Sequence, residues 1–263
     1  MAVTASDLVV YGSATMPTGD VALPGGAIDT NVKMTFTDMS QTTGLVVSTD
    51  GIVDDFTVTA TGRDYAGSIV TDSFVVSTTL ARVTGTSVTQ FERILRLCVT
   101  AGSHTGIITI EEDDGPTFTS IGTMESGVNN IYRPFYGASS SASAAKTYFE
   151  KVFIKNNSIT NSLLSAAVVE SGEVGFASKV TFDLTSSGVS DSYSSGNRLS
   201  PPPDSQILSA DASTGFTDAS KNVVSGDLGS LSHQGLWMKL SLGAAAPSAS
   251  GTWVVEINGS TTA

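Results

Sequence analysis

Short runs of β-branched and aromatic residues, separated by glycine and other turn-forming residues, fill residues 61–110 of the chain. The segment reads TGRDYAGSIVTDSFVVSTTLARVTGTSVTQFERILRLCVTAGSHTGIITI. Gly, Asp or Ser residues recur in it at roughly ten-residue intervals, which is typical of antiparallel strands joined by tight turns. The segment therefore favours a β fold, and it contains almost no chemically reactive side chains.

Composition favours the same fold class. Charged residues make up 14% of the chain, against about 25% in an average soluble protein. Exposed helix faces need residues such as Lys and Glu, whereas Thr and Val suit a pleated, half-buried surface. Lys is scarce and Thr and Val are abundant, so we expect an all-β protein with one large or two smaller domains in its 263 residues.

Alternation of apolar and polar residues predicts the strands of the first half, because successive side chains of a strand point to opposite faces. The alternation covers residues 33–37, 56–61 and 74–76, with a turn at residues 63–67. These segments predict strands with one face in a core and one face toward water.

The second half contains four further predicted strands. Residues 148–155 carry apolar groups on both faces, which is typical of a central strand. Residues 180–184 give the clearest half-buried strand, and residues 236–242 and 253–257 provide the closing strands.

Residues 91–99 fit two spacings. The helical set is Phe91, Ile94, Leu95 and Cys98, and the strand set is Phe91, Leu95, Leu97 and Val99, interrupted by Arg93. We predict a strand, because the run is short and leads through residues 101–103 into a cleaner strand at residues 107–110.

An acidic turn, EEDDGPTFTSIG at residues 111–122, is the expected boundary between two domains. We therefore expect β-sandwich or jelly-roll-like domains at residues 1–115 and 120–263. The first is the more acidic, since residues 1–130 hold 15 acidic and 5 basic side chains and residues 131–263 hold 10 and 8.

A long polar excursion is predicted at residues 185–222, where the alternation stops. It begins with the Ser- and Gly-rich residues 185–198, which cannot bury enough apolar area to order themselves. Loops of this length are usually functional or disordered. The excursion is therefore either a mobile surface loop or a docking arm, and a docking arm should be protease-sensitive until it binds.

The net charge of −12 disfavours direct binding to nucleic acid, because no Lys or Arg cluster offsets it. Two interpretations of the acidity stay open: it aids solubility, or it faces a basic partner surface. The start of the chain lacks the features of a signal peptide, and no segment approaches the ~20 apolar residues of a membrane span. We expect the protein to be made in the cytoplasm, and we expect no association with a membrane.

Candidate catalytic and metal-binding residues are few. His104 and His233 lie in turn-like settings without a second His or Cys at ligand spacing. Cys98 is the single cysteine, so no internal disulfide forms, and its apolar surroundings predict a buried, inert thiol. The chain has no G-x-S-x-G elbow and no phosphate-binding glycine loop. We therefore predict no enzyme activity, no catalytic residues, no cofactor and no metal site.

Three minor alternatives stay open. The acidic residues 111–114 invite a calcium site, although they lack the spacing of a helix-loop-helix site and fit a solvated turn better. Two opposed carboxylates of a glycosidase would need no sequence motif. A sugar-binding aromatic platform, and with it a carbohydrate-binding module, is the third alternative. Its candidate residues are Tyr132, Phe135, Tyr136, Trp237 and Trp253.

Two segments resemble structural proteins of tailed-bacteriophage virions. The first is the cadence G-x-D-x-x-G-x-x-x-T-(D/E)-x-(F/L) within residues 61–110, followed by an aromatic-led strand and a TG-x-I-T-I strand. The second is the strand at residues 149–156, followed by an Asn-Asn-Ser turn and an L-x-x-A-x-V strand. The turn residues can cap their own backbone, so residues 149–170 predict a hairpin.

The resemblance implies a non-enzymatic virion component made in the host cytoplasm. We expect a capsid decoration or cement protein on the outside of the phage head, with the major capsid protein or other virion proteins as partners. The chain would act as a homo-oligomer or multivalent array. The sequence shows no fibrous repeat, coiled coil or long helix. A tail, neck or baseplate subunit is the alternative, and a carbohydrate-binding module for host attachment is more distant.

Overall fold

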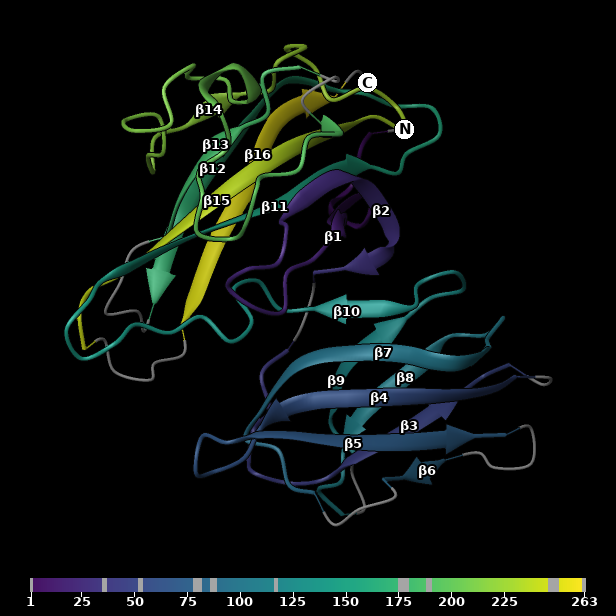
Figure 1. Ribbon diagram of the computed structural model, residues 1–263. Coiled ribbons are helices and arrows are strands. Elements are labelled where there is room, and N and C mark those ends of the chain that lie inside the picture. The colour runs from purple at the N-terminus through teal and green to yellow at the C-terminus, as the bar shows by residue number, and fades with distance from the viewer. Residues whose placement is uncertain are drawn as a thin grey trace. The chain divides into compact units, whose positions relative to one another are not determined.

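A computed structural model describes residues 2–34, 37–51, 54–77, 82–85, 89–115, 118–174, 180–187, 191–245 and 251–261. Strand accounts for 52% and helix for 3% of the structure, and the strands form several sheets (Figure 1). Two short 3-10 turns are described, η1 (Ala5–Asp7) and η2 (Asp204–Gln206). The predicted all-β fold is confirmed. No helix in the described residues is long and apolar enough to span a membrane.

The chain divides into two compact units. Unit 1 combines Met1–Asp29 with Phe135–Ala263, and unit 2 is Thr30–Pro134. In chain order, unit 2 is therefore an insertion within unit 1. This division differs from the expected one, in which the boundary lies at residues 115–120.

Unit 2 consists of two sheets that share one apolar core. Alternate residues of its strands, such as Phe56, Val58 and Phe74, are buried in that core, as their spacing predicts. One sheet has the order β2 (Gly25–Lys33), β10 (Asn130–Tyr132), β7 (Arg93–Ser103), β4 (Asp55–Arg63) and β5 (Ile69–Val76), where β2 contributes its residues 30–33. The other has the order β6 (Val83–Thr84), β3 (Leu45–Thr49), β8 (Ile108–Glu112) and β9 (Ser120–Met124).

The ambiguous segment at residues 91–99 is a strand, because β7 covers its larger part. Thr61 pairs with Arg96 and Gly62 with Ile94, so Leu95 is the extra residue of a β-bulge. Ile94 and Leu95 are both buried. The bulge explains why a helical spacing also fits these apolar residues.

The acidic segment at residues 111–122 lies within unit 2 and is part of a hairpin. β8 and β9 pair antiparallel, with Ile110 opposite Gly122. Glu112 is fully buried and accepts hydrogen bonds from the backbone nitrogen and the hydroxyl of Ser40. Carboxylates with such partners can be buried inside a fold. A run of acidic residues therefore need not mark a linker.

Unit 1 also has two sheets. The predicted strands at residues 148–155, 180–184, 236–242 and 253–257 are confirmed, and the first of them, β11 (Lys146–Asn156), is central, with neighbours on both sides. The larger sheet has the order β13 (Val180–Leu184), β15 (His233–Leu242), β11 (Lys146–Asn156), β1 (Leu8–Thr15) and then the first residues of β2. The smaller has the order β14 (Lys221–Asn222), β12 (Leu163–Val174) and β16 (Thr252–Thr261).

The pairing of β1 with β11 explains why the expected domain division differs from the observed one. Leu8 lies opposite Asn156 and Gly12 opposite Val152, so the first strand belongs with the second half of the chain. A pairing between strands so far apart in sequence leaves no local signal. The predicted strand at residues 33–37 lies mostly beyond β2, and residues 35 and 36 are outside the described residues.

The predicted hairpin at residues 149–170 is wrong. β11 pairs with β1 and β15, whereas β12 lies in the other sheet with β14 and β16. Asn156 explains the difference, because its buried side chain donates to the carbonyls of Asn161, Leu228 and Gly229 at 2.8 to 3.1 Å. These hydrogen bonds fix a corner between the two sheets in place of a tight turn.

Candidate functional site

Most of the predicted excursion is packed on unit 1. We call residues 191–220 the anchored loop; it is the larger described part of the connection from Thr185 to β14, in which residues 186 and 187 are also described. Bridges join Thr185 to Ile207 and Phe182 to Thr217, so the loop covers β13. Ile207 and Phe216 are buried against Phe149 and Trp237. The expectation that residues 185–198 cannot order themselves is therefore wrong for residues 191–198, where Ser195 and Arg198 are buried. Ile207 and Phe216 provide apolar anchors for the rest of the loop.

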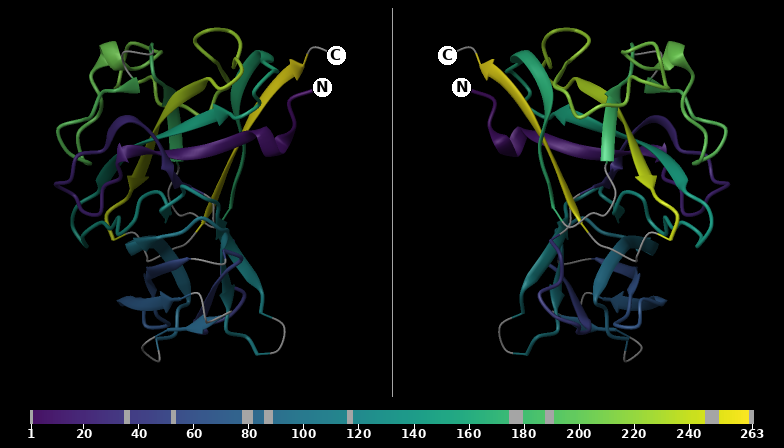
Figure 2. Two further views of the ribbon diagram at one scale, coloured as in Figure 1. Left: turned by 90° about the vertical axis from the view of Figure 1, so that its right-hand side faces the viewer. Right: turned by 90° about the vertical axis from the view of Figure 1, so that its left-hand side faces the viewer.

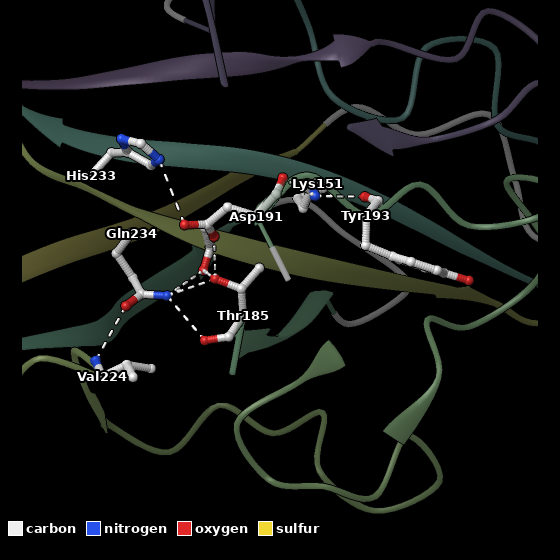
Figure 3. Close-up of polar contacts among 8 residues, drawn as sticks. Lys151, Thr185, Asp191, Tyr193, Val224, His233 and Gln234 are labelled. Atoms are coloured by element: carbon white, nitrogen blue, oxygen red, sulfur yellow. Dashed lines mark hydrogen bonds and ion pairs between the residues drawn. The ribbon is translucent and has the colours of Figure 1, made fainter. Parts of the chain in front are cut away.

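A buried lysine holds the start of the anchored loop. Lys151 of β11 is fully buried, and its Nζ donates to the backbone oxygens of Asp191 and Tyr193, both at 2.6 Å (Figure 3). The ammonium group also lies 5.4 Å from the centre of the Trp237 ring. Burial lowers the pKa of Lys151 to about 8, although the charge of Asp191 opposes this shift.

A buried ion pair holds the middle of the loop. Arg198 and Glu150 of β11 have fully buried side chains, and Arg198 Nη2 contacts Glu150 Oε1. Arg198 Nη1 donates to the backbone oxygen of Tyr136 at 2.6 Å, and Glu150 Oε2 accepts from the backbone nitrogen of Phe135 at 2.8 Å. Burial raises the pKa of Glu150, while the charge of Arg198 and the Phe135 N–H oppose this shift.

Asp183 of β13 contacts the loop at Ser209 and the following strand, β14, at Lys221. This carboxylate is fully buried and accepts a hydrogen bond from the backbone nitrogen of Ser209 at 3.2 Å. Its Oδ1 lies 3.3 Å from Lys221 Nζ. The strand at residues 180–184 was predicted to be half-buried. The structure corrects this, because the loop also covers its polar side.

His233 belongs to a polar network that has the wrong order for nucleophilic catalysis. His233 Nε2 lies 3.5 Å from Asp191 Oδ2, and Asp191 Oδ1 accepts from the Thr185 hydroxyl at 2.5 Å (Figure 3). In a hydrolase triad the histidine lies between the nucleophile and the acid. Here the carboxylate lies between them, and Thr185 is fully buried. Gln234 completes the network by donating to Thr185 at 2.9 Å, so the arrangement suits anchoring.

Two candidate residues, His104 and Cys98, lie in unit 2. His104 is buried, with Nδ1 2.8 Å from the Gly106 oxygen and Nε2 3.0 Å from the Val128 oxygen. It borders a hollow of about 340 Å³ lined mainly by the end of β7 and by Gly127 and Asn129. Cys98 is a free thiol of intermediate exposure, which corrects the prediction of a buried one.

The acidic residues 111–114 have separate partners. Glu111 pairs with Arg82, Glu112 binds Ser40 and Asp114 accepts from Thr119. Within the residues that the structure describes, no group of three or more His, Cys, Asp or Glu side chains is arranged to hold a metal ion.

The five aromatic candidates do not form one platform. Trp237 and Tyr132 are buried, at 0% and 2% exposure, so their rings are closed to a sugar. Tyr132 also belongs to unit 2, whereas Trp237 belongs to unit 1.

Comparison with known proteins finds no relative: no family model, curated protein or solved structure matches the chain.

Proposed function

We propose that this chain is a non-enzymatic structural protein of a tailed-bacteriophage virion, and that it decorates and stabilises the outside of the head. The observation that carries the proposal is the anchored loop. Three buried charged groups of the strands that the loop covers, Lys151, Glu150 and Asp183, fix its position. A surface loop held in one conformation loses less entropy on docking than a mobile one.

The exposed side of the anchored loop has the chemistry of a docking surface. Leu199 and Leu208 are 39% and 40% exposed although the loop is ordered. Asp204 and Asp218 are also exposed, and Arg198 is fully buried, so the accessible charge is acidic. Hydrogen bonds from Ser213 and Thr214 lower the pKa of Asp211 to about 2, which keeps it ionised. Such a surface fits a partner with basic and apolar groups.

The structure changes one argument for docking. The sequence halves suggest a strongly acidic N-terminal domain, but unit 1 holds 13 acidic and 7 basic residues and unit 2 holds 12 and 6. Both units therefore have a net charge of −6. Because the two units have equal net charge, acidity gives no reason to place the docking surface on unit 2. The proposal places it on the anchored loop of unit 1.

The family resemblance supports the proposal through the fold. Residues 61–110 extend from the end of β4 into β8, and residues 149–156 belong to β11. Both segments provide core strands, so the resemblance concerns the scaffold and leaves the docking surface to be tested.

The experiment is a copy count in purified virions. A decoration protein should be present in hundreds of copies, near the count of the major capsid protein, because each contact is weak and the array is strong. Particles lacking the chain should assemble but rupture more easily on heating. About six or twelve copies would place the chain at the neck, tail or baseplate. Absence from virions would refute the proposal.

A further inference from the structure

The outer edge of β16, the last strand of its sheet, is ten residues long. β16 pairs with β12 along most of its length, from Leu163 opposite Thr261 to Val174 opposite Thr252 (Figure 2). On its other side it has no neighbouring strand among the described residues. A strand edge of this kind presents a row of backbone N–H and C=O groups that can pair with another chain.

Two other edge strands carry protective features. On β5, the inward-pointing Asp72 is buried and its carboxylate accepts from the Ser73 N–H at 2.8 Å. On β13, bridges to Thr217 and Ile207 cover the strand and the residue after it. Buried charges and covering loops are common ways to block edge pairing.

β16 has neither feature in the described structure. Its sequence, TWVVEINGST, contains no Lys, Arg or Pro and a single charged residue, Glu256. The two bulges of the β12 and β16 pair place their extra residues on β12, between Leu164 and Ala167 and between Glu170 and Gly172. The edge strand therefore keeps a regular register over ten residues.

The side chains of β16 are complementary to a second copy of the same strand. Trp253, Val255 and Ile257 are half-buried on one face, where Trp253 packs 5.9 Å from the Phe182 ring. Val254 and Glu256 are exposed on the other face. We propose that the β16 edge is a self-association surface, on which a second copy of this chain adds its own β16 antiparallel about a two-fold axis.

The charge of Glu256 and the pairing of the apolar side chains together favour one register. A two-fold axis keeps like faces together only when one residue lies opposite itself. Centring the pair on Glu256 would place two carboxylates opposite each other, which is destabilising. Centring it on Val255 places Trp253 opposite Ile257, a favourable aromatic and β-branched pair, and Glu256 opposite Val254. Because one strand edge is small beside the ~800 Å² per partner of a standard interface, the dimer should be reversible.

Sedimentation of the full chain at increasing concentration tests the proposal. The wild type should dimerise, and Val254→Glu should weaken the dimer about fivefold to tenfold, because two like-charge pairs then form across the axis. Adding Glu256→Lys to Val254→Glu should restore the dimer, since each pair becomes oppositely charged. Thr71→Glu, on the exposed face of β5, is the matched control and should change nothing.

Circular dichroism of each variant verifies folding. A wild type that stays monomeric up to about 0.1 mM, where a complex of moderate affinity would form, would overturn the proposal. An unchanged dimer in Val254→Glu would do the same. The proposal is independent of the virion proposal, because a monomer in solution would leave the copy count in virions unaffected.

Discussion

Arg198 of the anchored loop and Glu150 of β11 form an ion pair in which both side chains are fully buried. The backbone of Tyr136 and Phe135 provides further hydrogen bonds to the two groups. A buried pair adds little net stability over apolar residues, but removal of one partner leaves the other charge without compensation. The pair therefore fixes the position of the loop relative to β11.

Arg198→Ala should lower the free energy of unfolding by about 3–5 kcal/mol, because Glu150 is left buried and uncompensated. Urea denaturation of the variant and the wild type measures the difference. Arg198→Met combined with Glu150→Leu should recover most of the loss, since both charges are then absent. The control is Arg82→Ala, which removes a side chain 47% exposed in its ion pair with Glu111 and should cost about 1 kcal/mol or less.

Lys151 should make the stability of the protein rise with alkaline pH. Its pKa is about 8 in the folded chain against 10.5 in the unfolded one, so between these values the unfolded chain binds more protons. Stability rises with pH wherever the unfolded state binds more protons.

Measured against Lys151→Met, the wild type should therefore gain at most about 3 kcal/mol of unfolding free energy from pH 8 to 10.5. Denaturant titrations at several pH values provide the measurement, and other titrating groups cancel in the comparison. A difference that stays constant over this range would show that Lys151 keeps an ordinary pKa.

The strands were predictable because their signal is local. Phe56, Val58 and Phe74 alternate with polar residues, and the structure buries each of them. Strand pairing was less predictable, because it depends on partners far apart in sequence. The pairing of Tyr11 with Phe153 is an example.

The anchors of the loop were missed for a different reason. Lys151 and Asp183 occupy strand positions that normally face water, and they are buried only because a distant loop covers them. A weak signal existed: Lys151 lies between two apolar neighbours of the same face, Phe149 and Phe153. In the loop, Arg198 is the one basic residue in the Ser- and Gly-rich residues 185–198.

Asp54 of unit 2 should add stability that is lost in acid. Burial alone would raise its pKa, but hydrogen bonds from Thr105, Thr49 and Gly106 lower it from 3.8 to about 2. A depressed carboxyl pKa stabilises the fold above the unfolded value and loses this contribution as pH falls through the folded value. Asp54→Asn should therefore cost about 2 kcal/mol at pH 6, and the cost should shrink between pH 4 and pH 2. Acid titration of both proteins by circular dichroism measures this.

The anchored loop should resist proteolysis in the free protein, contrary to the behaviour of a disordered docking arm. Thermolysin cleaves beside apolar residues, and Leu199 and Leu208 are exposed, but cleavage requires local unfolding of the backbone around them. In the wild type, opening the loop exposes the buried ion pair of Arg198, so cleavage should be slow. In Arg198→Ala this ion pair is absent, and cleavage at these leucines should accelerate at least tenfold, which corresponds to a free energy of loop opening lower by about 1.4 kcal/mol or more. Arg82→Ala, whose exposed ion pair lies in unit 2, is the control and should keep the wild-type rate. Rapid cleavage of the wild type within residues 191–220 would show that the buried anchors do not hold the loop in solution.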